Sequence, residues 1–126
     1  MNGLLSGVEI IAKAVSKETG SIEFLISPDT VTGQSKVGAG AGAIRVETVH
    51  LDGFLDAAGL RVFIKMDIEG HELEAIKGME RLLTTNKVFM QVECFAANAP
   101  SQDKAMATLG LKRRHRIDHN HYFSNF

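Results

Sequence analysis

The chain of 126 residues contains no tryptophan, one tyrosine and one cysteine. The scarcity of Trp and Tyr argues against stacking platforms for nucleic-acid bases. A single cysteine, Cys94, cannot form a disulfide within the chain, which excludes an internal disulfide framework and fits a reducing compartment. Because Cys94 ends an apolar run, we interpret it as a small buried side chain and not as a nucleophile.

The chain also lacks a dominant charge and a long apolar run. Its formal net charge is -1, and its densest group of cations, from Lys112 to Arg116, is closely followed by Asp118, which favours a solvated strand face over a phosphate-binding track. No apolar stretch reaches the roughly 20 residues that a membrane span needs, and the N-terminus has no signal-peptide pattern. We therefore expect a cytoplasmic protein that binds neither nucleic acid nor a membrane.

The length and the hydrophobic pattern predict one α/β domain spanning residues 1–126. Apolar and β-branched runs predict strands, and helical spacing of apolar residues predicts helices. The expected strands are residues 8–15 and 21–26, which form a hairpin, then 44–48, 62–66 and 88–92. Helices are expected from residue 51, over 70–83 and over 101–109, before a terminal antiparallel pair at 111–117 and 121–123. Alternating strands and helices predict a mostly parallel sheet.

Acidic residues follow the two apolar runs that have the character of buried parallel strands. Asp67 comes directly after residues 62–66, and Glu93 comes directly after residues 88–92. In open α/β sheets, ligands bind beyond the carboxyl ends of the strands. We therefore expect Asp67 and Glu93 to lie at one common edge and to share a pocket.

The start of the helix that follows Asp67 carries further candidates. Glu72 precedes Ala75 and Ile76 by three and four residues, so it shares their inward face and should be half buried. Glu69 and Glu72 could equally serve only to complement the helix dipole, which is worth about 0.3–1 kcal/mol each. His71 is an attractive base because its ordinary pKa lies near neutrality, although a lone histidine at a helix start is more often just exposed.

Two other patterns suggest ligand sites, but we interpret them as ordinary structural segments. The glycine-alternating run from Gly38 to Ala43 is followed by a strand-like pattern, whereas a nucleotide-binding loop requires a following helix. His115, His119 and His121 lie within seven residues, with Asp118 among them, but nothing beside them would orient metal ligands. We expect a loop and a polar turn, and no metal site.

The order of these residues resembles the FkbM family of S-adenosylmethionine-dependent methyltransferases. The similarity centres on Lys-x-Asp-x-Glu-Gly-x-Glu followed by Ile, Lys-Gly and a strand ending in Val-Glu, and it extends from about residue 8 to 110. Weaker similarities are Thr-x-x-Leu-Asp at 48–52 and Ala-Val-Ser-x-x-x-Gly at 14–20. The residues that carry the central match are Lys65, Asp67, Glu69, Gly70, Glu72, Ile76, Lys77, Gly78 and Glu93.

This resemblance implies a fold, a reaction and a cofactor. The fold would be the mostly parallel, Rossmann-like sheet of class I methyltransferases, truncated at its N-terminus and ending in an antiparallel hairpin. The reaction would be O-methylation, by S-adenosylmethionine, of a hydroxyl on a sugar, a polyketide or a similar metabolite. The implied catalytic residues are Asp67, Glu69, His71, Glu72 and Glu93, and the implied cofactor-binding residues are Ala14, Val15, Ser16 and Asp67.

The resemblance leaves an alternative to catalysis. The chain is expected to begin just before the third strand of the family's sheet and to lack the Gly-rich strand that holds part of the cofactor. The strand at 62–66 would then lose its natural neighbour and keep an apolar, unpaired edge, which favours self-association. The alternatives are therefore an inactive remnant that forms a homo-oligomer, or a module that binds a saccharide without chemistry.

Overall fold

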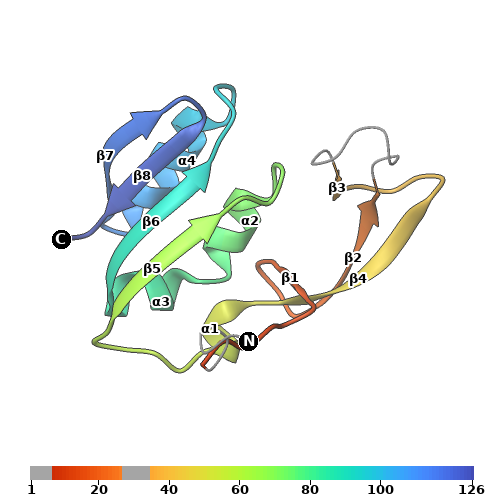
Figure 1. Cartoon of the computed structure of the whole chain (residues 1–126), viewed down its shortest axis with the longest axis horizontal. Helices are drawn as coiled ribbons and strands as arrows, with labels where there is room; N and C mark the ends of the chain where they lie inside the picture. Colours follow the sequence, from red (N-terminus) through yellow and green to blue (C-terminus); the bar gives the residue numbers. More distant parts are fainter. Residues whose placement is uncertain (1–6, 27–34) are drawn as a thin grey trace, which may run out of the picture.

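The computed structural model describes residues 7–26 and 35–126. These residues form two four-stranded sheets and a set of short helices (Figure 1). The strands β1 to β4 make the first sheet, which we call the N-terminal sheet, and β5 to β8 make the second, the C-terminal sheet. The chain passes from one sheet to the other once, through the segment between β4 and β5.

The N-terminal sheet has the order β1-β4-β2-β3. Its strands are β1 (Ala14–Val15), β2 (Gly20–Leu25), β3 (Lys36–Val37) and β4 (Ala43–Val49). β4 pairs parallel with β1 and antiparallel with β2, and β2 pairs antiparallel with β3. The two long strands β2 and β4 therefore carry this sheet, and the two-residue strands β1 and β3 extend it on either side.

The C-terminal sheet has the order β5-β6-β8-β7. Its strands are β5 (Arg61–Met66), β6 (Lys87–Glu93), β7 (Lys112–Ile117) and β8 (Asn120–Ser124). β5 and β6 are parallel, whereas β6 with β8 and β8 with β7 are antiparallel. The carboxyl ends of β5 and β6 consequently lie at the same edge.

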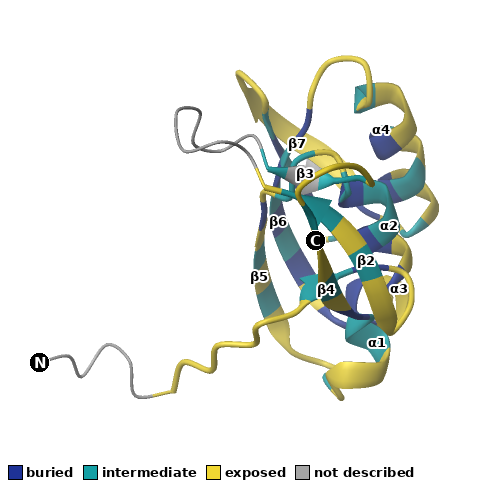
Figure 2. Cartoon of the chain, turned by 90° about the vertical axis from the view of Figure 1, so that its right-hand side faces the viewer, coloured by how far each residue is buried: buried dark blue, intermediate teal, exposed yellow. Residues whose placement is uncertain are grey.

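The helices gather on one face of the C-terminal sheet (Figures 1 and 2). They are α2 (Glu72–Lys77), α3 (Glu80–Thr85) and α4 (Ala99–Thr108), while α1 (Leu51–Phe54) follows the N-terminal sheet. Alternate residues of β6 point into the core beneath these helices, as period-two side-chain alternation requires. The buried core residues include Ile76, Leu83, Val88, Met90, Val92, Met106 and Phe123.

The expected mostly parallel, Rossmann-like sheet is wrong. The structure has two mixed sheets, in which the pairs β1–β4 and β5–β6 are parallel and the pairs β2–β3, β2–β4, β6–β8 and β7–β8 are antiparallel. The prediction of a parallel sheet relied on the run of strand, helix, strand in the middle of the chain, and that run does give the parallel pair β5–β6. β7 and β8 are joined by the short turn at Asp118 and His119, and short turns join antiparallel strands. β8 then pairs antiparallel with β6. The C-terminal hairpin itself is confirmed.

Two local predictions also need correction. Residues 8–15 were expected to pair with 21–26, but β1 covers two residues and pairs with β4 instead. The single helix expected over 70–83 is two helices, α2 and α3, separated at Gly78 and Met79. The break is stabilised from outside the helix, because the amide of Asp52 donates to the carbonyl of Gly78 at 2.9 Å. The Ser-, Gly- and Thr-rich composition of residues 28–42 predicts a loop, and part of that stretch lies outside the described residues.

Among the described residues, no helix has the length and apolar character needed to cross a membrane.

Candidate functional site

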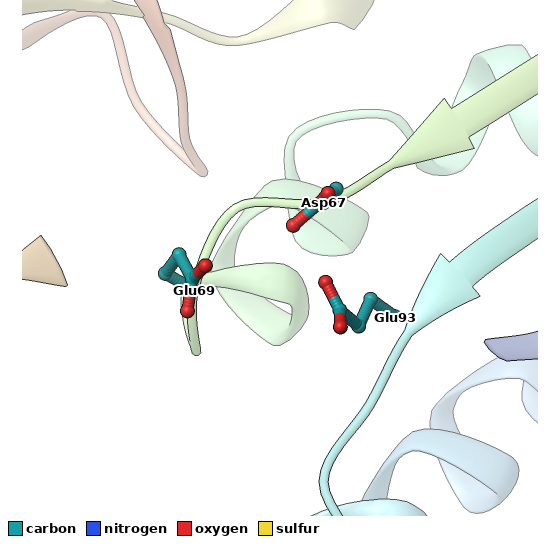
Figure 3. A group of neighbouring side chains, drawn as sticks. All are labelled: Asp67, Glu69 and Glu93. Atoms are coloured by element: carbon teal, nitrogen blue, oxygen red, sulfur yellow. The ribbon is translucent and has the colours of Figure 1, made fainter. Parts of the chain in front are cut away.

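Three carboxylates come together at the carboxyl ends of β5 and β6, and we call them the acidic cluster. They belong to Asp67, Glu69 and Glu93, and each offers an oxygen within 4.8 Å of those of the others. Figure 3 shows Asp67 and Glu93 following their strands and Glu69 on the turn beyond Asp67. The predicted common edge for Asp67 and Glu93 is confirmed by this placement. Three carboxylates at such a distance can attract one cationic group, or a hard cation with oxygen ligands.

A sharp turn brings Glu69 back toward the strand ends. Glu69 and Gly70 both have positive φ angles, 53° and 96°. Glycine adopts this conformation freely, but a glutamate there is uncommon. The Gly70 amide donates to the Oε1 of Glu72 at 3.0 Å, so the carboxylate of Glu72 holds the turn from the first residue of α2. Glu72 is buried more fully than the half burial predicted, and it supports the turn without being part of the acidic cluster.

The charges of the acidic cluster act on one another. A hydrogen bond with Asp67 and the negative charge of Asp67 raise the pKa of Glu93, and burial and Glu69 add to the rise. A carboxyl group held between like charges is protonated more readily than one in water. Lys65 lies 3.6 Å from Asp67 on the exposed side, where solvent weakens the pairing. The neighbouring carboxylates thus favour proton binding by Glu93.

His71 joins the turn to the N-terminal sheet. Its Nε2 lies 3.0 Å from the hydroxyl oxygen of Ser16, the residue that follows β1. Ser16 is buried, and its own amide donates to the carbonyl of Val49 at 3.0 Å. His71, at the start of α2, is therefore held in place by Ser16 at the end of β1. This contact links the N-terminal sheet to a helix that covers the C-terminal sheet.

A cavity of about 280 Å³ lies between the N-terminal sheet and this turn. One wall is apolar and comes from β1, β2 and β3, and the other comes from the turn after β5. The lining residues are Lys13, Ala14, Val15, Ile22, Phe24, Ser35, Val37, Asp67, Ile68, Glu69 and His71. A concave site with apolar walls and a few converging polar groups is the usual form of a small-molecule pocket.

Close backbone packing fixes the distance between the two sides of the cavity. A Cβ built on Gly78 would overlap the carbonyl oxygen of Ser16, so the end of α2 can approach β1 only if residue 78 is glycine. Nearby, the carboxylate of Asp52 accepts the amides of Arg81 and Leu82 at 2.7 and 2.8 Å. Asp52 thereby satisfies free N–H groups at the start of α3. Gly78 of the Lys-Gly part and Asp52 of the Leu-Asp part of the sequence signature therefore have structural roles here.

The structure brings most of the predicted site residues to one place. Ala14 and Val15, predicted to bind the cofactor, line the cavity together with His71 and two members of the acidic cluster. Ser16 lies behind His71 as its hydrogen-bond partner. The apolar wall of Ile22, Phe24 and Val37 was not foreseen. The alternation of Ile22 and Phe24 in a predicted strand was the available signal, but it could not show which way that face points.

The glycine-alternating run and the C-terminal histidines, interpreted above as structural segments, are not part of this site. Between Gly40 and Ala43 the chain makes a turn into β4, with the amide of Ala43 donating to the carbonyl of Gly40 at 3.1 Å. His115 packs beside Tyr122, with ring centroids 6.2 Å apart. His121 is fully buried instead, and burial followed by the charges of nearby arginines lowers its pKa. The expected polar turn is thus only partly right, because His121 belongs to the interior.

The described residues form a mixed-sheet protein with a cavity of small-molecule size beside carboxylates at the ends of two parallel strands. The FkbM methyltransferase domain matches residues 5–117, and the chain belongs to this family. The resemblance inferred from the sequence signature is therefore confirmed.

One curated relative is similar over part of its length. It is the hexuronic acid methyltransferase AglP of Haloferax volcanii, which is 32% identical over 81 residues. The aligned region covers 62% of this chain and 34% of the relative, so the chain matches about a third of that protein. No solved structure is significantly similar to the chain.

Proposed function

We propose that the chain takes part in S-adenosylmethionine-dependent O-methylation of a hydroxyl group on a sugar or sugar acid. The observation that carries this proposal is the acidic cluster beside a cavity whose far wall is apolar. Membership of the FkbM family supports methyl transfer, and the hexuronic acid named for the relative supports a saccharide acceptor.

The residues that line the cavity fit the charge and shape of this cofactor. S-adenosylmethionine carries an apolar, flat adenine and two positive groups, a sulfonium and an ammonium. Val15 and Phe24 offer apolar surface of the kind that buries an aromatic ring. Asp67 and Glu69 offer negative charge at the opposite side of the same cavity, where it stabilises a cation. We assign Ala14 and Val15 to the adenine and Asp67 to the methionyl end.

The acceptor hydroxyl needs a group that removes its proton. When bound, S-adenosylmethionine supplies an electrophilic methyl group. Glu93 is our candidate base, because its raised pKa brings it closer to neutrality and an effective base has a pKa near the working pH. Asp67, next to it, would stabilise the proton after transfer, and Glu69 and His71 would orient the acceptor. We assign no catalytic role to Glu72, because its carboxylate is committed to the Gly70 amide.

Calorimetric titration with S-adenosylmethionine tests this assignment. We expect Asp67→Ala to weaken binding by about tenfold, since loss of one charged partner costs on the order of 1–3 kcal/mol. Asp118→Ala is the matched control, because Asp118 is an exposed aspartate in the turn between β7 and β8. Equal losses in the two variants would contradict the site. Absence of measurable binding by the wild-type chain would contradict the proposed cofactor role itself.

A further inference from the structure

The core beneath α4 contains polar side chains that lack hydrogen-bond partners. His121 of β8 is fully buried, and Gln102 of α4 is 1% exposed. Neither ring nitrogen of His121 and neither polar atom of the Gln102 amide has a partner among the described residues, and the same holds for one carboxylate oxygen of Asp103. Buried polar groups without partners are rare in folded proteins, so this group calls for a physical reason.

The topology places His121 and Gln102 at the same end of the core, and we call these two residues the polar layer. His121 pairs with Val92 near the carboxyl end of β6. α4 leaves that end of β6 and runs in the direction of β8 (Figure 1). Met106 follows Gln102 by about 6 Å along α4, and Phe123 follows His121 by about 6.6 Å along β8. Met106 and Phe123 both belong to the hydrophobic core, so the polar layer lies where that core ends.

The burial of His121 arises from elements that the described residues contain. Its ring lies on the face of the C-terminal sheet that the helices cover (Figure 2), and α4 packs against both β7 and α2 on that face. Further residues could only cover the ring more completely. The ring is therefore out of contact with water as long as α4 remains on the sheet.

The surroundings of His121 do not favour a positive charge on its ring. Arg116 lies directly across the ladder from His121, and Asp103 of α4 is already paired with Arg113 at 2.9 Å. Burial is the main reason that the pKa of His121 is lowered, and the charges of Arg113 and Arg116 come next. Asp103 opposes this decrease, and His119 adds to it. The folded core thus favours the uncharged ring, since a buried charge without a partner is costly.

The other titratable groups near the polar layer do not supply a compensating charge. Cys94 follows Val92 by two residues at the end of β6, and burial, followed by the charge of Glu72, raises the pKa of its thiol. The thiol is therefore uncharged at neutral pH. Glu72, at the start of α2, accepts the amide of Gly70 with its carboxylate. A proton on His121 would consequently add a cation beside two arginines and one carboxylate that is already paired.

We propose that His121 is a pH-sensitive element beneath α4, and that its protonation releases α4 from the C-terminal sheet. Histidine is the side chain whose charge ordinarily changes between pH 5 and 8. Because the folded pKa of His121 is lowered, its contribution to the stability of the closed form is present above the ordinary pKa of 6.5 and is lost as pH falls. Displacement of α4 gives the charged ring access to water.

Release of α4 would also change the surroundings of the acidic cluster. Residues 94–98 connect Glu93 to α4, and within them the amide of Asn98 donates to the carbonyl of Phe95 at 2.9 Å. Acidification should therefore loosen the loop that follows Glu93, and the Asn98 amide should report it. The expected response requires neither cofactor nor acceptor, so it can be measured whether or not the chain transfers methyl groups.

Amide hydrogen exchange followed by NMR tests the release of α4. Protection factors, which correct for the direct effect of pH on exchange, are compared at pH 7 and pH 5. We expect α4 amides to lose at least fivefold in protection while β6 amides keep theirs. The loss cannot exceed about 25-fold, the limit for one histidine whose ordinary pKa is 6.5. The ring signals of His121 should show proton uptake over the same pH range.

Two substitutions separate His121 from the other groups that titrate in this range. His121→Gln keeps a polar side chain that cannot take up a proton, so its α4 protection should be the same at pH 7 and pH 5. His115→Gln removes an exposed histidine of β7 and should keep the wild-type response. Circular dichroism checks that both variants fold. If His121→Gln does not fold, the wild-type chain still decides, because ring protonation and loss of α4 protection must coincide.

Three results would overturn the proposal. Unchanged protection of α4 at pH 5 would show that the core accepts or excludes the proton without opening. Increased protection would show that protonated His121 pairs with Asp103 and holds α4 more tightly. An equal loss of protection in folded His121→Gln would assign the acid response to other groups.

Discussion

The two sheets of this protein are stabilised in different ways. The C-terminal sheet lies under α2, α3 and α4 and shares a continuous core with them. In the described part of the N-terminal sheet and its flanking residues, burial is confined to Ser16, Thr48 and Val49, beside the ends of β1 and β4. The C-terminal sheet therefore has a core of its own, whereas the N-terminal sheet is positioned by contacts at one end.

The N-terminal sheet and the turn after β5 line the cavity. Its shape therefore depends on the N-terminal sheet, which has fewer buried residues. The acidic cluster follows strands that the core holds in place, but the apolar wall belongs to β1, β2 and β3. The contacts that join the wall to the rest include the bond between Ser16 and His71, the close approach of Gly78 to Ser16 and the bond from the Asp52 amide to Gly78. An ion pair between Lys17 and Glu74 adds to them. Changes at these contacts should alter the site before they unfold the protein.

The largest expected change in the free energy of unfolding tests the difference in core packing between the two sheets. Leu83 is fully buried beneath the C-terminal sheet, whereas Ile44 on β4 is 46% exposed. We expect Leu83→Ala to lower the free energy of unfolding by about 2–5 kcal/mol, through lost burial and a residual cavity. Ile44→Ala should change it by less than about 0.5 kcal/mol. Urea unfolding measures both, and similar losses would contradict the proposed division between the sheets.

A smaller effect is expected where the two sheets meet. Gly78→Ala would place a methyl group against the carbonyl of Ser16, and relief of such overpacking costs about 1–3 kcal/mol. The φ angle of residue 78 is -82°, which alanine tolerates, so the expected cost is steric. Hydrogen exchange should show faster exchange of β2 and β4 amides while β6 amides remain protected.

Gly20→Ala is the matched control for this prediction. A Cβ on Gly20 would lie 3.8 Å from the hydroxyl oxygen of Thr48, an ordinary contact distance. We therefore expect its hydrogen-exchange pattern to match that of the wild type. Loss of hydrogen-exchange protection across both sheets in Gly78→Ala would contradict this prediction. It would mean that the two sheets unfold together.

The local elements could be predicted from the sequence, but the way they join could not. The apolar runs before Asp67 and Glu93 give β5 and β6 almost residue for residue. Pairing depends on distant residues: β1 pairs with β4 and not with its neighbour β2. The helix break at Gly78 likewise depends on Asp52, 26 residues earlier in the chain, through a bond to the Gly78 carbonyl. Hydrophobic periodicity contains no information about such partners.

The site residues that directly follow strand ends could be predicted from the sequence. The residues placed by a backbone angle or by a side-chain hydrogen bond could not. Asp67 and Glu93 lie together because parallel strands end at one edge. Glu69 joins them through a positive φ angle, which helix spacing could not reveal. The use of Glu72 as the partner of the Gly70 amide was also missed, because side-chain periodicity gives the face of a residue but not its hydrogen bond.

The smallest expected change in the free energy of unfolding comes from the acidic cluster. There, the close carboxylates of the proposed site repel one another and lower stability. The pKa of Glu93 is raised in the folded chain, mainly by its hydrogen bond and repulsion with Asp67. A carboxyl group with a raised folded pKa makes its full contribution to stability below its unfolded pKa, ordinarily near 4.5. That contribution is lost as pH rises through the folded pKa. At neutral pH, Glu93 therefore destabilises the chain.

Glu93→Gln should relieve this repulsion. We expect the variant to be more stable than the wild type at pH 7, by less than about 1 kcal/mol because the cluster stays hydrated. The difference should disappear below the ordinary glutamate pKa, where the wild-type residue is protonated in both states. Urea midpoints at pH 7 and pH 4 measure the effect, with Glu23→Gln as a control at an exposed glutamate of β2. An equal gain for Glu23→Gln, or a gain for Glu93→Gln that persists at pH 4, would show that the stabilisation does not arise from repulsion among Asp67, Glu69 and Glu93.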